Sequence, residues 1–104
     1  LYDFYGELLT PHQRKIYEDV VFNDMSLSEI AEEQGISRQG VHDLVKRCDK
    51  TLAEYESKLK LVEKFHQTRR MVEEIRQLTG AYQKNQDMKL IQKIQQIAGE
   101  IIEL

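Results

Sequence analysis

The stretch "SLSEIAEEQGISRQGVHDLVKR", Ser26–Arg47, predicts two helices joined by a tight turn. Ser26 with Glu29 three residues later is a capping box, which starts the first helix. Gly35 ends that helix, because glycine adopts the left-handed conformation that closes a helix at little cost. Ser37 then caps the start of the next helix. The segment is therefore expected to form a helix-turn-helix, in which the two helices cross at a steep angle.

The crossing of two such helices needs a small residue at the contact and apolar residues around it. Ala31 is the small residue here. The apolar residues that we expect to be buried beside it are Ile30, Ile36, Val41 and Leu44. Two positions fit less well. Gln34 stands where an apolar residue is expected, and Gly40 weakens the first turn of the second helix by up to about 1 kcal/mol relative to alanine.

Helices are also predicted on both sides of this stretch. Thr10, with proline next and Gln13 third, predicts a helix from residue 11 to about 22, and residues 1–9 read as the end of an earlier helix. From residue 38 onward the sequence predicts one long helix to residue 79, with a kink or break near His66. Its apolar residues alternate steps of four and three, as in a heptad seam. They are Val41, Val45, Cys48, Leu52, Tyr55, Leu59 and Val62.

A second seam with the same spacing predicts a final helix after Gly80, where the chain can fold back. This seam consists of Leu90, Ile94, Ile97, Ile101 and Leu104. A helix of this length is marginal in water by itself, so the seam must pack on the long helix of the same chain or of a second chain. We expect a homodimer. The residues expected to hold it are Leu59, Val62, Leu90, Ile94, Ile97 and Ile101.

Composition agrees with an all-α fold, since the chain has 104 residues, 40% of them hydrophobic, and only one proline and five glycines. We expect a helix-turn-helix unit over residues 1–50. The long helical extension and the C-terminal helix, residues 51–104, form with it one compact domain or serve as a dimerisation arm. No apolar run is long enough to span a bilayer and no signal peptide is apparent, which favours a cytoplasmic protein without a membrane partner.

The residues expected of an enzyme or of a metal site are missing from the sequence. The single Cys48 excludes an internal disulfide and is expected to be buried, and the three histidines are scattered rather than spaced as metal ligands. No nucleophile with a neighbouring base, phosphate-binding loop or carboxylate pair stands out. We therefore expect no enzymatic activity, no catalytic residue, no cofactor and no metal.

Residues 8–61 resemble region 4 of bacterial sigma factors, and more closely the small YlxM-like bacterial proteins. The motifs that carry the resemblance are the Thr-capped helix, S-L-x-E-I-A-E-x-x-G-[IV]-S-R-Q and E-Y-E-x-K-L. The resemblance implies an all-helical fold and a regulatory role. Genes of this family lie beside those of the signal recognition particle, so the resemblance further implies docking on a protein or ribonucleoprotein of that pathway.

The resemblance to sigma region 4 implies in addition that the second helix of the motif contacts DNA. The matching positions are Arg38, Gln39 and His42, followed by Lys46 and Arg47. Arg38 suits a phosphate or a guanine edge and Gln39 suits adenine.

Charge argues against strong binding to nucleic acid. Affinity for nucleic acid comes largely from neutralised phosphates, and the whole chain has a net charge of −3. The quoted stretch itself has more acids than bases. The acids are Glu29, Glu32, Glu33 and Asp43, and the bases are Arg38, Lys46 and Arg47. Two hypotheses remain open: docking on protein or ribonucleoprotein, RNA included, and sequence-specific binding of DNA as a transcription regulator.

Overall fold

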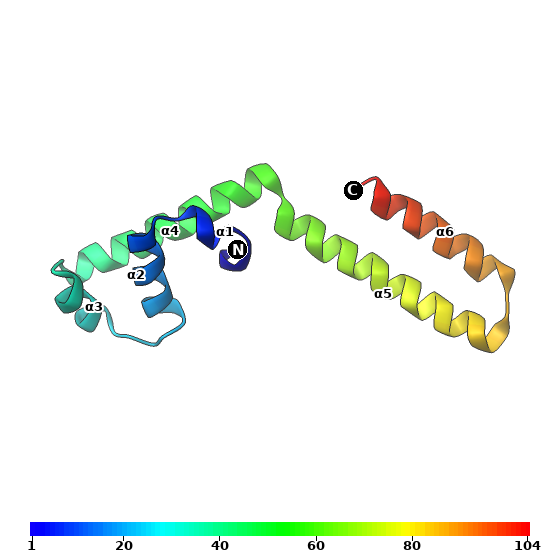
Figure 1. Cartoon of the computed structure of the whole chain (residues 1–104), viewed down its shortest axis with the longest axis horizontal. Helices are drawn as coiled ribbons and strands as arrows, with labels where there is room; N and C mark the ends of the chain where they lie inside the picture. Colours follow the sequence, from blue (N-terminus) through cyan, green and yellow to red (C-terminus); the bar gives the residue numbers. More distant parts are fainter. The chain divides into compact units, whose positions relative to one another are not determined.

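The computed structural model describes residues 1–104 and contains helices and no β-strand (Figure 1). The predicted all-α fold is confirmed. The chain divides into two units, Leu1–Lys60 and Leu61–Leu104. The division that the sequence suggested, after residue 50, falls inside a helix of the first unit.

The first unit begins with two short turns and continues with three helices. They are α1 (Tyr2–Tyr5), the 3-10 turn η1 (Gly6–Leu8), α2 (Pro11–Val21), α3 (Leu27–Gln34) and α4 (Arg38–Leu59). The start of α2 has the predicted capping box. The Thr10 hydroxyl accepts from the Gln13 N–H at 3.2 Å, and the Gln13 side chain accepts from the Thr10 N–H at 3.0 Å. Both hydrogen bonds satisfy donors that a helix start would leave unpaired.

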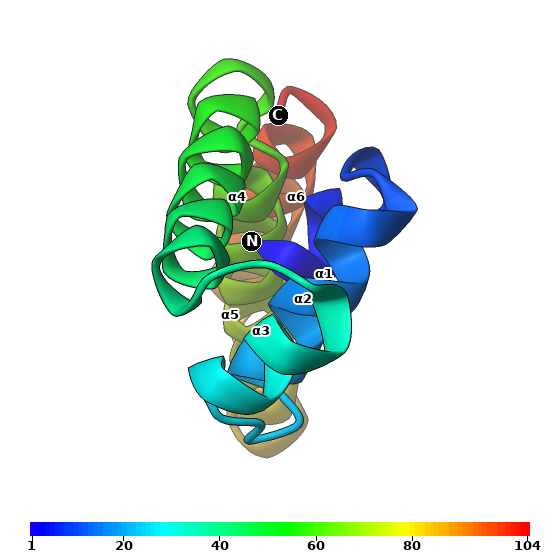
Figure 2. The same ribbon diagram turned by 90° about the vertical axis from the view of Figure 1, so that its left-hand side faces the viewer.

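The helix-turn-helix of α3 and α4 forms where the sequence predicts it (Figure 2). The Ser26 and Ser37 hydroxyls cap the two helices by accepting from the backbone N–H three residues on, at 3.1 and 2.9 Å. Gly35 ends α3 in the left-handed conformation, with φ of 69°. The Glu29 side chain accepts from the Ser26 hydroxyl instead of its backbone, so only half of the capping box forms.

Residues from three helices form the core of this motif. Ile30, Ala31 and Val41 are buried as predicted, and Ile16 of α2 is buried with them. Leu44 is only partly buried. The predicted burial of Ile36 is wrong, because its side chain is 38% exposed. It lies in the turn over Gly40, where an added β-carbon would stand 3.9 Å from the Ile36 Cδ1.

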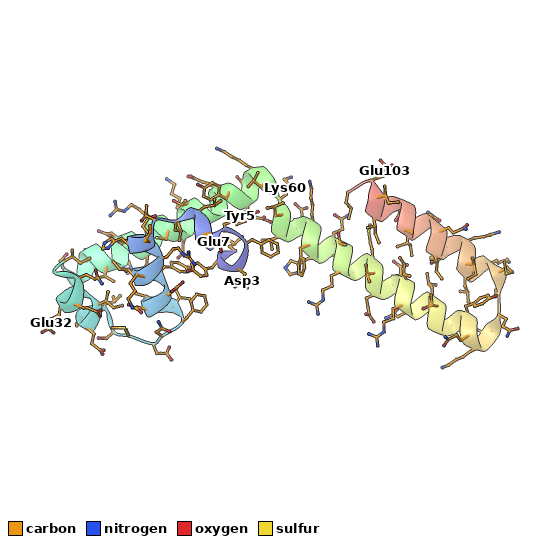
Figure 3. The ribbon with its side chains drawn as sticks, in the orientation of Figure 1. Asp3, Tyr5, Glu7, Glu32, Lys60 and Glu103 are labelled. Carbon is orange, nitrogen blue, oxygen red and sulfur yellow. The ribbon has the colours of Figure 1, made fainter.

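The second half of α4 anchors the N-terminal turns. Cys48 is buried as predicted. The Tyr5 hydroxyl donates to Glu56 Oε1 at 2.6 Å, and the Tyr5 ring, which Figure 3 labels, stacks on Tyr55. The Tyr17 hydroxyl of α2 donates to Asp49 Oδ1 at 2.8 Å. These contacts make the full length of α4 part of the first unit.

The predicted long helix over residues 38–79 is interrupted, but not near His66 as expected. It ends at Leu59, and Lys60 adopts a left-handed conformation with φ of 54° before α5 (Leu61–Asn85) begins. His66, where a break was expected, lies inside α5. Gly80, where the helix was expected to end, also lies inside α5. One glycine destabilises a helix by only about 1 kcal/mol, and the packing of α5 on α6 offsets this.

The second unit is an antiparallel hairpin of α5 and α6 (Met88–Ile102), as Figure 1 shows. Gln86 turns the chain with φ of 51°, and the Asp87 carboxylate caps α6 by accepting from the Lys89 N–H at 2.9 Å. α6 packs along α5 through most of the predicted seam, since Ile97 is buried and Leu90, Ile94 and Ile101 are half-buried, whereas Leu104 at the end of the chain is exposed. No helix has the length and apolar character needed to cross a membrane.

Candidate functional site

Residues at the start of α4 surround a shallow hollow of about 390 Å³. It is lined by Arg38, Gln39 and His42 of α4 and by Leu27 at the start of α3. The turn at Gly35 brings these two helix starts together, because it lets α4 begin directly after α3 ends. Three of the five predicted nucleic-acid contacts therefore lie at one place on the surface.

The other two predicted contacts lie further along α4. Lys46 follows Gln39 by seven residues, which is two turns of a helix, so it points to nearly the same side. Arg47 follows Arg38 by nine residues, or two and a half turns, and points to the opposite side. Arg38, Lys46 and Arg47 are exposed and form no ion pair within the chain. Two cations, Arg38 and Lys46, are therefore available to a ligand at the hollow.

Asp43 organises the polar side chains next to the hollow. Its Oδ1 accepts from the Gln39 Nε2 at 3.0 Å, and the His42 Nδ1 lies 3.9 Å from the same oxygen. This hydrogen bond uses one of the two N–H donors of the Gln39 amide and leaves the second N–H and the oxygen available to a ligand. The sequence contains the signal for this contact, since residues four apart are neighbours on a helix.

Acidic side chains dominate the surroundings. The first unit has eight Lys and Arg against twelve Asp and Glu, a net charge of −4. Glu29, Glu32 and Glu33 are all exposed on α3, and Figure 3 labels Glu32 at the surface of that helix. Leu27 is the residue of the hollow that the sequence analysis missed. It was identifiable only once the start of α3 was placed beside α4.

The residues predicted to hold a dimer lie in three places. Leu59 is exposed at the end of α4 and Val62 is half-buried in the first turn of α5. The other four face α5 of the same chain, one of the two arrangements that the sequence allowed. Of these, Ile97 is buried and Leu90, Ile94 and Ile101 are half-buried.

Comparison with known proteins identifies the family. Residues 1–97 match the UPF0122 family of YlxM/p13-like helix-turn-helix proteins. A UPF0122 protein of Thermoanaerobacter pseudethanolicus is 42% identical over 105 aligned positions, which cover 100% of this chain and 90% of that protein. One of Desulforamulus reducens is 40% identical over 103 positions, covering 99% and 88%. One of Bacillus cereus is 44% identical over 92 positions, covering 88% and 84%. The chain therefore belongs to the UPF0122 family of YlxM/p13-like helix-turn-helix proteins, as its motifs indicate.

Proposed function

We propose that this protein is a non-enzymatic regulator whose helix-turn-helix unit docks on a protein or ribonucleoprotein of the signal recognition particle pathway. The charge of the unit carries the proposal. Its net charge of −4 disfavours the binding of free nucleic acid, and it offers only Arg38 at the hollow, with Lys46 one helical turn beyond His42. A docking surface needs fewer phosphate contacts than a module that binds DNA by itself.

The hollow suits a compact anionic group with an apolar neighbour. The Arg38 guanidinium can form a two-pronged pair with a carboxylate or a single phosphate, and Leu27 offers apolar contact beside it. A ribonucleoprotein presents both kinds of group close together. The choice of pathway rests on the resemblance to the YlxM-like family, because the genes of that family lie beside those of the signal recognition particle.

A second candidate function is sequence-specific binding of DNA. In helix-turn-helix proteins the N-terminal residues of the second helix contact base edges. Arg38, Gln39 and His42 lie on the first two turns of α4 and are all exposed. Asp43 adds an acceptor for the amino group of cytosine, although its charge repels phosphate.

Affinity capture from bacterial lysate, with and without nuclease, tests both functions. Recovery of signal recognition particle proteins after nuclease treatment supports protein docking, and recovery lost on ribonuclease treatment supports docking through RNA. Enrichment of particular DNA fragments, without the particle, contradicts the first proposal and supports the second.

Variants at the hollow complete this experiment. Arg38→Ala should abolish the capture, because it removes the cation that lines the hollow. The matched control is Lys58→Ala, which removes an exposed cation near the other end of α4. If both variants capture the same partners as the wild type, the hollow is not the docking site.

A further inference from the structure

We propose that α6 dimerises with α6 of a second copy through an outer stripe, defined as Met88, Ile91, Gln95, Ala98 and Ile102. These residues follow one another in steps of three and four, the spacing of a heptad seam. They form a second stripe, beside the seam that packs on α5. The inference is independent of the proposed function, since it concerns a different unit.

The outer stripe is exposed although most of it is apolar. Ile102 is 82% exposed and Met88 is 62% exposed. Ala98 is exposed and Ile91 is half-buried. Single exposed apolar residues are ordinary on a protein surface, but a row of them at heptad spacing marks a contact surface.

The charged residues of α6 lie on a side of the helix away from the outer stripe. The charged residues of the helix and its C-cap are Lys89, Lys93, Glu100 and Glu103. At 100° per residue they fall within about 80° of each other, centred on the side opposite the outer stripe. The apolar arc that remains is wider than contact with α5 alone can cover. A partner for it must therefore be apolar.

The outer stripe is complementary to itself in the antiparallel direction. It extends seven residues on either side of Gln95, which places Met88 of one copy opposite Ile102 of the other and Ile91 within one residue of the level of Ala98. A larger residue then meets a smaller one in the Ile91–Ala98 pair, as interdigitated packing requires. This is the geometry of a twofold interface, in which the same patch serves both copies.

Gln95 is the single polar residue of the stripe, and it lies at the centre. A glutamine amide contains both a donor and an acceptor, so two of them can pair reciprocally across a twofold axis. A lone polar residue in an apolar seam is a known means of fixing the register of paired helices. The central Gln95 therefore favours a second copy of this chain as the partner, rather than an unrelated apolar helix.

The hairpin also lacks a core of its own. Within Leu61–Leu104 the only buried side chain is that of Ile97, and α5 contributes none. Two hairpins together make a four-helix bundle, which encloses a core that two helices cannot. The charge of the unit permits two hairpins to associate, because its seven Lys and Arg nearly balance its six Asp and Glu.

Sedimentation of stripe variants tests the dimer. Ala98→Glu and Ile102→Glu each place two unpaired charges in the interface, and each should raise the dissociation constant of the dimer by roughly a hundredfold or more. Gln96→Glu is the matched control, since it introduces the same charge on the charged side of α6, and it should keep the mass of two chains. A wild-type protein that sediments as one chain, or stripe variants that stay dimeric, would overturn the proposal.

Cross-linking gives a second measurement that does not depend on weakening the interface. Gln95→Cys places two thiols near the twofold axis, and oxidation should join two chains. Lys93→Cys, on the charged side, should give far less cross-linked dimer, and the native Cys48 is buried in both variants. Equal cross-linking of the two variants would contradict the interface.

Discussion

Gly35 shows how one residue determines the turn of the motif. Its φ of 69° belongs to the left-handed region, and no residue beyond its two chain neighbours lies within 4 Å of the position that a β-carbon would take. The free-energy cost of a side chain at this position therefore comes from the backbone conformation and not from a clash. Gly35→Ala should destabilise the first unit by about 1 kcal/mol, measured by thermal or urea unfolding.

Gly80 is the control for this prediction. It is also free of neighbours within 4 Å but lies inside α5, so Gly80→Ala should stabilise the hairpin by up to about 1 kcal/mol. The same chemical change should thus have opposite signs at the two positions. A stabilising effect of Gly35→Ala would contradict the assignment of the turn.

Tyr17 makes the stability of the first unit depend on pH in the alkaline range. Burial, and then the hydrogen bond to the Asp49 carboxylate, raise the pKa of Tyr17 to about 12. In the unfolded chain the pKa of tyrosine is about 10, so the unfolded state loses its proton first. The Tyr17 phenol therefore makes its full contribution to the free energy of unfolding below pH 10. This contribution is lost as the pH rises from about 10 toward 12.

Urea unfolding across this range measures the effect. The wild-type protein should lose stability as the pH rises through it, and Tyr17→Phe should lose less, because phenylalanine has no proton to release. If the two proteins lose stability in parallel, Tyr17 is not the residue responsible.

At the scale of helices, the ends that the sequence predicted correctly are those determined by local chemistry. Thr10, Ser26 and Ser37 cap helices through hydrogen bonds to residues three positions away, and Gly35 closes one through its own backbone. Such signals are complete within a few residues of sequence. This is why the helix-turn-helix was predictable.

The errors concern features that depend on distant residues. The break after α4 falls at Lys60, where the sequence contains neither glycine nor proline, and α5 continues through Gly80 because α6 packs along it. Ile36 was expected in the core by its place in the motif, but it lies in the turn. The hollow was only partly predictable, since Arg38, Gln39 and His42 came from the motif whereas Leu27 came from the packing of α3.

A substitution at Lys60 tests the break between α4 and α5. A non-glycine residue in the left-handed conformation is strained by roughly 1–2 kcal/mol, so Lys60→Gly should leave stability unchanged or raise it by up to about 1 kcal/mol. In a continuous helix the same substitution would cost about 1 kcal/mol. Urea unfolding of Lys60→Gly gives the sign, and a clear loss of stability would mean that the helix is continuous.

At the scale of the whole molecule, the proposed dimer alters what the helix-turn-helix unit can bind. One unit offers two cations, Arg38 at the hollow and Lys46 further along α4, which is too few for tight binding to a polyanion. Two units in such a dimer would engage neighbouring sites together, because the second binding event becomes intramolecular. Weak sites of this kind suit a regulator that must also release its partner.

Salt dependence of nucleic-acid binding measures how many of these cations take part. Each neutralised phosphate contributes about −0.9 to the slope of log affinity against log salt on duplex DNA, so one unit should give a slope near −2 and a dimer with both units engaged near −4. Arg38→Ala should reduce the steepness by about 1 per engaged unit, whereas Arg47→Ala, on the opposite side of α4, should leave it unchanged. Fluorescence anisotropy of a labelled duplex at several salt concentrations gives the slopes. Equal effects of the two substitutions would mean that nucleic acid contacts another face of α4, and binding indifferent to salt would mean that phosphates are not the ligand.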